Sequence, residues 1–201
     1  MPSRVLKSGV WRFFIMKFEA KWYLNNSVCE LIPPKLQDVR GFFSEVYQKE
    51  DFLTLGIEDE FMQDNHSLSV NKFTFRGMHL QKPPFEQAKL VRVLQGSILD
   101  VVVDLRKSST TYLQHCLIPV SAKDFNQVFV PVGFAHGFLT LEENTAISYK
   151  VSNPYDHSSD VSISVFDDTL GIKLPCSTKE MTFSDKDLHA PMVAQIGDIF
   201  K

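Results

Sequence analysis

The sequence lacks a run of about 18 apolar residues, the length that a membrane-spanning helix requires. It also lacks a C-x-x-C pair, because its three cysteines, Cys29, Cys116 and Cys176, are widely spaced. Isolated cysteines in odd number indicate free thiols in a reducing compartment, so we expect a cytoplasmic protein. The net charge of −3 offers no general attraction to nucleic acid or to an anionic membrane, and any phosphate-binding site must therefore be local.

The N-terminal stretch has no acidic residue before Glu19, although it contains several basic ones. Such a composition occurs in targeting peptides, but Arg12 interrupts the apolar run and no small-residue cleavage site follows. We therefore interpret residues 1–15 as an N-terminal extension, with Met16 as the alternative start. Residues 16–201 are enough for one domain with a sizeable core and too few for two.

Long helical patterns are scarce, and short β-branched runs separated by turn residues dominate the chain from about Asp38 onward. The runs 90–94 and 98–105 flank Gln95-Gly96-Ser97, which predicts an antiparallel hairpin with a glycine turn. Further runs at 127–130, 137–141 and 146–151 continue the series, and short helices are expected at 49–55 and 184–187. The pattern predicts an all-β fold, either a sandwich or a barrel.

The segment Arg76-Gly77-Met78-His79-Leu80-Gln81 carries the first candidate for chemistry. Alternate residues of a strand share a face, and a bulge brings residues three apart to the same side. We therefore expect Arg76 and His79 to lie together inside the barrel. An imidazole beside a fixed cation suits proton abstraction from an anionic, activated substrate.

His136 is the second candidate, since it ends a P-x-G-x-x-H sequence that resembles half of the metal motif of cupins. The other half requires H-x-H and a glutamate, whereas Gln81 stands in place of the second histidine. Glutamine is a poor ligand for zinc or iron(II), so we expect no catalytic metal. Asp100, an acid in an apolar run, would orient the His136 ring, which leaves a core role and a catalytic role both open.

A longer set of segments resembles the dTDP-4-dehydrorhamnose 3,5-epimerase family, a metal-free branch of the cupin jelly rolls. The segments run in order from about residue 30 to residue 195 without large gaps. They are 38–45, 61–67, 76–81, 87–93, 96–106, 133–138, 149–150, 168–172 and 184–191. The resemblance implies an antiparallel double-sheet jelly roll and places the usual family start near Met16.

The resemblance also implies a reaction, the conversion of dTDP-4-keto-6-deoxy-D-glucose to dTDP-4-keto-L-rhamnose in dTDP-L-rhamnose biosynthesis. The hydrogens at carbons 3 and 5 are α to the ketone, so removal of either leaves an enolate. Return of a proton to the opposite face inverts that carbon. This chemistry requires a base, an enolate stabiliser and an acid, but no redox cofactor or metal.

The family pattern gives each role a residue in this sequence. His79 matches the base, Asp187 the aspartate that orients it, Lys89 the partner of the oxyanion at carbon 4, and Tyr149 the acid at carbon 5. The residues expected to bind substrate are Arg76, Arg40, Glu45, Gln63, Asn65, His136 and Tyr155. In the family the N-terminal strand crosses to the partner subunit, so Arg40 and Glu45 are expected to serve the neighbour's site in a homodimer.

Three alternatives stay open. The same chemistry could act on another nucleotide-linked sugar or at carbon 3 alone, and a cupin could bind a sugar nucleotide without catalysis or carry a metal. The complete proton-transfer set argues against a binding module, and the missing H-x-H argues against a metal enzyme. Departures from the family pattern concern substrate detail more than mechanism, and they occur at Met78, His157, Asp160, Phe166 and Leu174.

Overall fold

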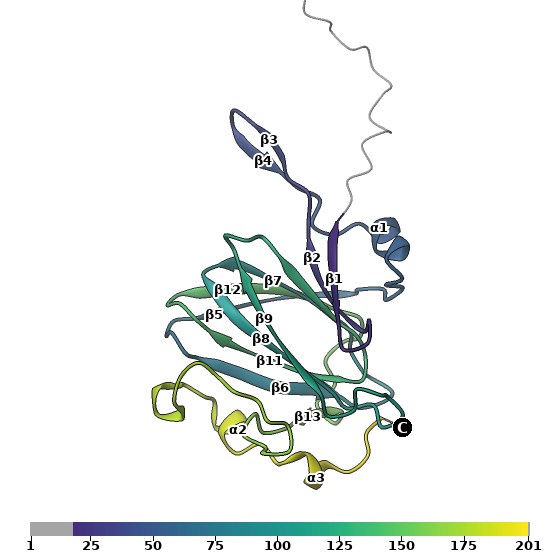
Figure 1. Ribbon diagram of the computed structural model, residues 1–201, viewed down its shortest axis with the longest axis vertical. Helices are drawn as coiled ribbons and strands as arrows, with labels where there is room; N and C mark the ends of the chain where they lie inside the picture. The colour runs from purple at the N-terminus through teal and green to yellow at the C-terminus, as the bar shows by residue number, and fades with distance from the viewer. Residues whose placement is uncertain (1–17, 201) are drawn as a thin grey trace, which may run out of the picture.

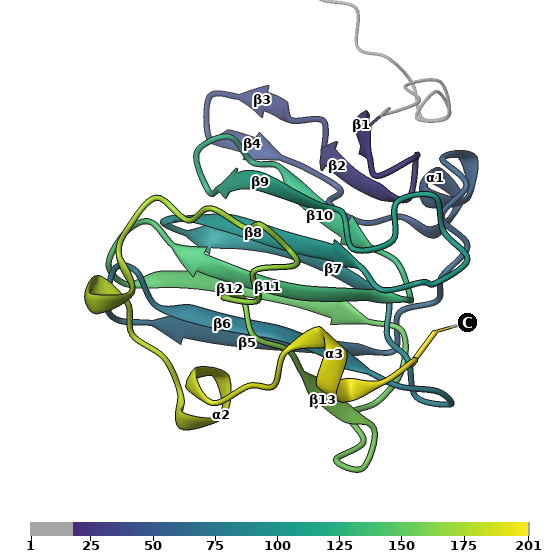
Figure 2. The same ribbon diagram turned by 60° about the horizontal axis from the view of Figure 1, so that its bottom comes forward.

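The computed structural model describes residues 18–200, which form two antiparallel sheets with a few short helices (Figures 1 and 2). The predicted extension at residues 1–15 lies outside the described part. The six-stranded sheet has the order β1 (Glu19–Tyr23), β2 (Val28–Ile32), β10 (Gln127–Val130), β7 (Lys89–Gln95), β12 (Thr145–Val151) and β5 (Gln63–Ser69). The five-stranded sheet has the order β13 (Asp160–Ser162), β6 (Phe75–Gln81), β11 (Phe134–Thr140), β8 (Ser97–Asp104) and β9 (His115–Ser121).

The main core lies between the two sheets. Val91 and Ile147 of the six-stranded sheet pack in one cluster with Val102 and Phe138 of the five-stranded sheet. Alternate residues of β8 instead face a second cluster, in which Val101 and other apolar residues pack under the C-terminal segment. The five-stranded sheet is therefore covered on both faces, and this C-terminal layer carries α2 (Asp185–Leu188) and α3 (Val193–Ile196), shown in yellow in Figure 2.

The predicted hairpin around Gly96 is wrong, although both of its strands exist. β7 pairs with β10 and β12, whereas β8 pairs with β11 and β9, so the two strands belong to different sheets. Gly96 has a φ of +79°, and a Cβ at this position would meet the Thr145 hydroxyl at 2.5 Å. A short glycine turn can connect strands of two different sheets as well as the two strands of a hairpin. Burial of β8 on both faces favours the connection between sheets.

The short helices begin where the sequence predicts. α1 (Lys49–Thr54) follows Gln48, whose side chain accepts from the amide of Asp51. α2 follows Ser184, whose hydroxyl accepts from the amide of Asp187. The remaining helical segment is a single 3₁₀ turn, η1 (Thr178–Glu180). No helix among residues 18–200 is long and apolar enough to cross a membrane.

One small hairpin projects away from the two sheets. β3 (Leu36–Asp38) and β4 (Gly41–Phe43) pair only with each other, and Figure 1 shows them extended beyond the body. All their residues are exposed. The exposed apolar side chains of this arm are Leu36, Val39, Phe42 and Phe43. Exposed apolar residues gathered on one segment are typical of an interaction surface.

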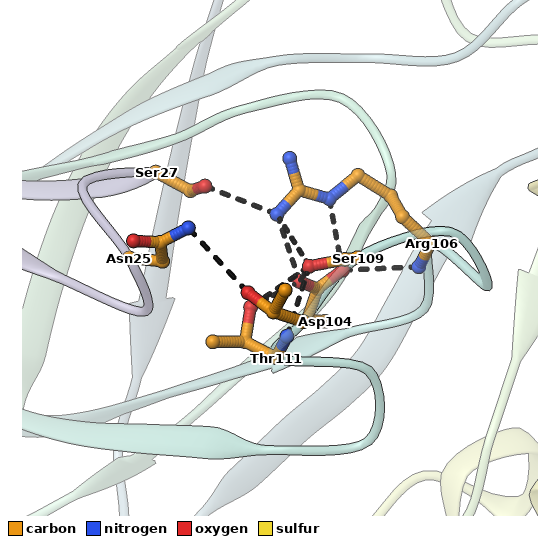
Figure 3. A network of polar contacts seen from close by, with 7 residues as sticks. Asn25, Ser27, Asp104, Arg106, Ser109 and Thr111 are labelled. Atoms are coloured by element: carbon orange, nitrogen blue, oxygen red, sulfur yellow. Dashed lines mark hydrogen bonds and ion pairs between the residues drawn. The ribbon is translucent and has the colours of Figure 1, made fainter.

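A buried polar network anchors the end of β8 (Figure 3). Asp104 is fully buried and accepts hydrogen bonds from the backbone and side chain of Arg106, from the Ser109 hydroxyl and from the Thr111 hydroxyl. Burial favours the neutral acid, but these donors outweigh it and lower the pKa of Asp104 to about 2. The Arg106 guanidinium also stacks on Phe134, 4.4 Å from the ring centroid.

Candidate active site

A cleft between the sheets contains most of the residues that the sequence singles out. Its first compartment, about 440 Å³, is lined by both sheets and by α2. Its second compartment, about 370 Å³, shares His79, Lys89, Tyr149 and Lys186 with the first, so the two adjoin. Of the remaining predicted residues, Arg76, His136 and Asp187 line the first compartment, and Gln63, Asn65 and Tyr155 line the second.

The centre of the cleft is a hydrogen-bonded histidine and aspartate. His79 Nε2 lies 2.6 Å from Asp187 Oδ1, and the His79 side chain is 35% exposed whereas that of Asp187 is only 4% exposed. Burial raises the pKa of Asp187, but the interaction with His79 and the hydrogen bond from the Gly77 amide outweigh it and leave the pKa below its ordinary value. Asp187 is therefore a charged acceptor that can fix the orientation of the histidine ring.

The path of β6 depends on Gly77. Its φ is +127°, and a Cβ at this position would meet the Gly137 Cα at 2.5 Å, so only glycine fits. The Gly77 amide donates to Asp187 Oδ2 at 3.3 Å, and the register between β6 and β11 shifts nearby. Arg76 and His79 consequently both reach the first compartment, as the expected bulge requires. Arg76 is held by Ser69 Oγ at 3.0 Å and by the Leu68 carbonyl at 3.2 Å.

Lys89 and Tyr149 come from the opposite sheet. The Lys89 ammonium donates to the His79 carbonyl at 3.2 Å. Desolvation lowers the pKa of Lys89 to about 8, against the opposing attraction of Asp100 and Asp160. Desolvation also raises the pKa of Tyr149, so its phenol stays protonated near neutral pH. The cleft thus places the His79 imidazole on one wall and a protonated phenol on the other.

A second histidine and aspartate pair lies on the neighbouring strands. His136 is the cross-strand partner of His79, and its Nε2 lies 2.8 Å from Asp100 Oδ2. Asp100 is completely buried, and its other carboxylate oxygen has no hydrogen-bond partner among the described residues. The predicted contact between these two residues is therefore present, and Asp100 lies behind His136 rather than at an edge.

Gln81 does not offer a free ligand to this site. Its amide nitrogen donates to the carbonyls of Phe85 and Pro154, and its oxygen accepts from the amide of Asp156. Among residues 18–200, no three His, Cys, Asp or Glu side chains lie close enough to hold a metal ion. The donor set is thus two separate histidine–carboxylate pairs, which suits proton transfer better than metal binding.

Arg40 and Glu45 do not line either compartment of their own chain. Arg40 lies at the tip of the β3–β4 arm, where its side chain is 86% exposed and pairs with Asp38. Glu45 follows the arm and is also exposed.

The sequence reasoning missed Lys186 and the role of Asp160. Lys186 lines both compartments and forms an ion pair with Asp160 Oδ2, to which the Tyr155 hydroxyl also donates at 3.0 Å. The position of Lys186 beside Asp187 was an available signal. The contribution of Asp160 depends on the pairing of β13 with β6, which the sequence pattern did not reveal.

A sequence profile described as dTDP-4-dehydrorhamnose 3,5-epimerase matches residues 25–195. The chain belongs to this family. The dTDP-4-dehydrorhamnose 3,5-epimerase of Sinorhizobium fredii is 41% identical over 164 residues, which cover 82% of this chain and 84% of the relative. The identification from sequence is therefore confirmed.

Two solved structures of the family support the fold. The Bacillus anthracis enzyme, determined with TDP and PPi bound, has a TM-score of 0.84 at 40% identity and covers 88% of this chain and 99% of its own. The Legionella pneumophila dTDP-6-deoxy-D-glucose-3,5-epimerase, in complex with dTDP-4-keto-L-rhamnose, has a TM-score of 0.84 at 35% identity. The match covers 89% of this chain and 94% of the Legionella chain. The predicted antiparallel double-sheet fold is thus confirmed.

Proposed function

We propose that this family member epimerises dTDP-4-keto-6-deoxy-D-glucose at carbons 3 and 5 to give dTDP-4-keto-L-rhamnose. The observation that carries the proposal is the 2.6 Å contact between His79 and Asp187 in a cleft that also presents Lys89 and Tyr149. The names of the relatives support the substrate, and the chemistry of the side chains supports the reaction.

His79 acts as the base. Its Nε2 donates to the charged Asp187, so the neutral ring keeps its free electron pair on Nδ1. That nitrogen takes the proton from the carbon next to the ketone, and the electron pair of the broken C–H bond forms the enolate. Asp187 stabilises the imidazolium that results, as the buried carboxylate does in a serine protease triad.

Lys89 and Tyr149 complete the reaction from the other sheet. The Lys89 ammonium stabilises the enolate oxygen, and its effect is strong because the group is desolvated. Tyr149 lies on β12 and His79 on β6, so the two side chains approach a bound sugar ring from opposite walls. Removal of a proton from one face and delivery to the other is what inversion requires, and Tyr149 is the donor proposed for carbon 5.

The proposed binding residues surround this centre. Arg76 and His136 contact the sugar side of the substrate, while Gln63, Asn65 and Tyr155 line the compartment proposed for the nucleotide. A guanidinium matches phosphate oxygens in a two-pronged geometry, which suits Arg40 for the diphosphate. Asp100 supports the cleft by orienting His136.

The exposed arm supports a homodimer in which each subunit completes the site of the other. Arg40 and Glu45 lie outside their own cleft, and the apolar residues of β3 and β4 need cover. Mixing the inactive variants His79→Ala and Arg40→Ala under conditions that exchange subunits tests this. Half of the dimers are then mixed, each with one intact site, so about a quarter of wild-type activity should return. No recovery in verified mixed dimers would contradict the shared site.

Proton exchange in deuterium oxide tests the proposed reaction. The protein is incubated with dTDP-4-keto-6-deoxyglucose, and carbons 3 and 5 are followed by NMR. Deuterium at both carbons with inversion supports the proposal. Deuterium at carbon 3 alone indicates a single epimerisation, and tight nucleotide binding without exchange indicates a binding protein.

A further inference from the structure

A third cavity, of about 510 Å³, lies apart from the cleft, and none of its lining residues lines either compartment of the cleft. It is formed by the β1–β2 hairpin, the segment that follows α1, the end of β10 and the residues just after β8. Trp22 and Phe129 are both register partners of Cys29, so the three side chains share one face of the six-stranded sheet. That face points away from the core between the two sheets.

The floor of this cavity is apolar. Ile57 and Phe129 are buried, and Trp22 and Leu55 pack against the same cluster. A concave site with an apolar floor and a few polar groups is the usual form of a small-molecule site, and its volume lies in the range of such sites. Of the aromatic side chains, the indole of tryptophan attracts a cation most strongly.

Arg106 is one of the polar groups of the cavity, but its charge is already compensated. Its Nε and Nη2 atoms bind Asp104, and Nη2 also donates to Ser27 Oγ at 3.0 Å, which fixes the β1–β2 turn (Figure 3). Among residues 18–200, Nη1 has no hydrogen-bond partner. Arg106 therefore offers the cavity a hydrogen-bond donor rather than an unpaired positive charge.

Asp59 is the charged group of the cavity that lacks a counter-ion. It is partly buried, and within the described part of the chain no basic side chain pairs with it. Burial raises the pKa of its carboxyl, and the nearby Glu58 raises it further. A cation bound beside Asp59 would reverse this shift. The lining side chains thus carry one uncompensated negative charge beside an aromatic ring.

We propose that this cavity binds a small organic cation, with an ammonium group on an apolar or aromatic body. The ammonium pairs with Asp59, and the body packs on Trp22 and Phe129. An alkylammonium stays protonated at neutral pH, as a lysine side chain does. The inference does not depend on the proposed function, because the cavity and the cleft share no lining residue.

Three probes of similar size and different charge test the site. They are phenethylammonium, the neutral 2-phenylethanol and the anion 3-phenylpropionate. Binding is followed by NMR through the indole N–H of Trp22, one of two tryptophans in the chain, which is assigned by its loss in Trp22→Phe. Phenethylammonium should shift this resonance saturably with a Kd of about a millimolar, as suits a ligand of this size. The other two should bind at least about tenfold more weakly.

Asp59→Asn and Glu58→Gln are the matched variants. Each removes one negative charge from adjacent positions, but only Asp59 lines the cavity. Loss of a charge-assisted contact should weaken phenethylammonium binding about tenfold in Asp59→Asn, and Glu58→Gln should change it by less than about twofold. Thermal unfolding gives a second readout, since the ligand should raise the Tm of the wild type and of Glu58→Gln more than that of Asp59→Asn.

Four results would overturn the inference. Tighter binding of 3-phenylpropionate would indicate an anion site at Arg106, and equal binding of 2-phenylethanol would leave Asp59 without a role. Equal losses in the two variants would reduce the effect to general charge attraction. A resonance that no probe shifts saturably would exclude this class of ligand. Both variants should keep wild-type exchange at carbons 3 and 5, since neither residue lines the cleft, so these results leave the proposed function intact.

Discussion

Asp104 and Asp187 are both buried aspartates, with side chains 0% and 4% exposed, yet their surroundings differ. Asp104 accepts from five donors, three of them from Arg106, a residue that stays charged at any ordinary pH. Asp187 accepts with its side chain from His79 and, at 3.3 Å, from the Gly77 amide. Asp104 thus pairs with a side chain that is always charged, whereas Asp187 pairs with a histidine, a residue type that can gain and lose a proton.

Asp100 extends the comparison to the second pair of the cleft. One of its oxygens is bound by His136, and the other has no partner among residues 18–200 although Asp100 is completely buried. Buried polar groups are usually satisfied, and the Asp104 network follows that rule. Asp100 therefore differs from both Asp104 and Asp187, since each of those two carboxylates has a partner on both oxygens.

The largest expected effect comes from His79→Ala, which removes the histidine partner of Asp187. General base catalysis contributes about 10²–10⁴-fold, so exchange at both carbons should fall by that factor. The fold should survive, because the His79 side chain is 35% exposed. Deuterium incorporation by NMR and thermal unfolding measure the two properties separately. Exchange at carbon 5 that persists at the wild-type rate would show that another base serves that carbon.

Asp104→Asn should do the reverse, and damage stability while sparing chemistry. Loss of one partner of a buried ion pair leaves Arg106 poorly compensated and costs about 3 kcal/mol of unfolding free energy. The folded fraction should keep its kcat within about twofold, since Asp104 does not touch the cleft. Urea unfolding and the exchange assay at low temperature provide the measurements. A large fall in kcat at full stability would erase the distinction drawn between the two aspartates.

Tyr149→Phe sharpens the comparison within the cleft. The change removes the proposed proton donor of one wall and leaves the proposed base on the other, so inversion at carbon 5 should fall about 10²-fold and exchange at carbon 3 less. NMR of the product and of deuterium at each carbon reports the difference. Equal losses at both carbons would instead assign Tyr149 to binding or to enolate stabilisation.

Sequence reasoning predicted most of the fold and the chain's own part of the cleft, for identifiable reasons. The β-branched run at 98–105 and the start of a short helix at Ser184 are local patterns, and both are present in the structure as β8 and α2. The family pattern placed His79, Lys89 and Tyr149 in one cavity. The prediction of a hairpin at Gly96 was wrong, because the partner of each strand depends on packing between the sheets, which the residues near the turn do not determine.

The sequence also did not indicate that Asp104 accepts five hydrogen bonds. Asp100 and Asp104 lie on the same face of β8, four residues apart. No feature of the neighbouring sequence indicates that Asp100 pairs with a histidine and Asp104 with Arg106. Lys186 and Asp160 also come together only because β13 lies beside β6. Long-range contacts of this kind are fixed by strand order rather than by residue pattern.

The smallest expected effect concerns pH and compares Lys89 with Asp104. Desolvation lowers the pKa of Lys89 from 10.5 to about 8, whereas hydrogen bonds lower the pKa of Asp104 from 3.8 to about 2. Asp104 stabilises the fold above its ordinary pKa, and this contribution is lost as pH falls through the range from about 4 to 2. Burial of the Lys89 charge instead opposes folding below pH 8, and the cost is relieved as pH rises from about 8 to 10.5.

Activity and stability should therefore respond to Lys89 in opposite directions. Above about pH 8 the ammonium loses its proton, so kcat should fall toward tenfold per pH unit while the contribution of Lys89 to stability rises. Because the pKa of Tyr149 is raised, loss of the phenol proton does not cause this fall in kcat above about pH 8. Lys89→Arg retains a charge at these pH values and should move the alkaline limb upward, although the larger group lowers the maximal rate. Profiles of kcat and of urea unfolding over the same pH range test both trends, and an alkaline limb that stays near pH 8 in Lys89→Arg would assign it to a different group.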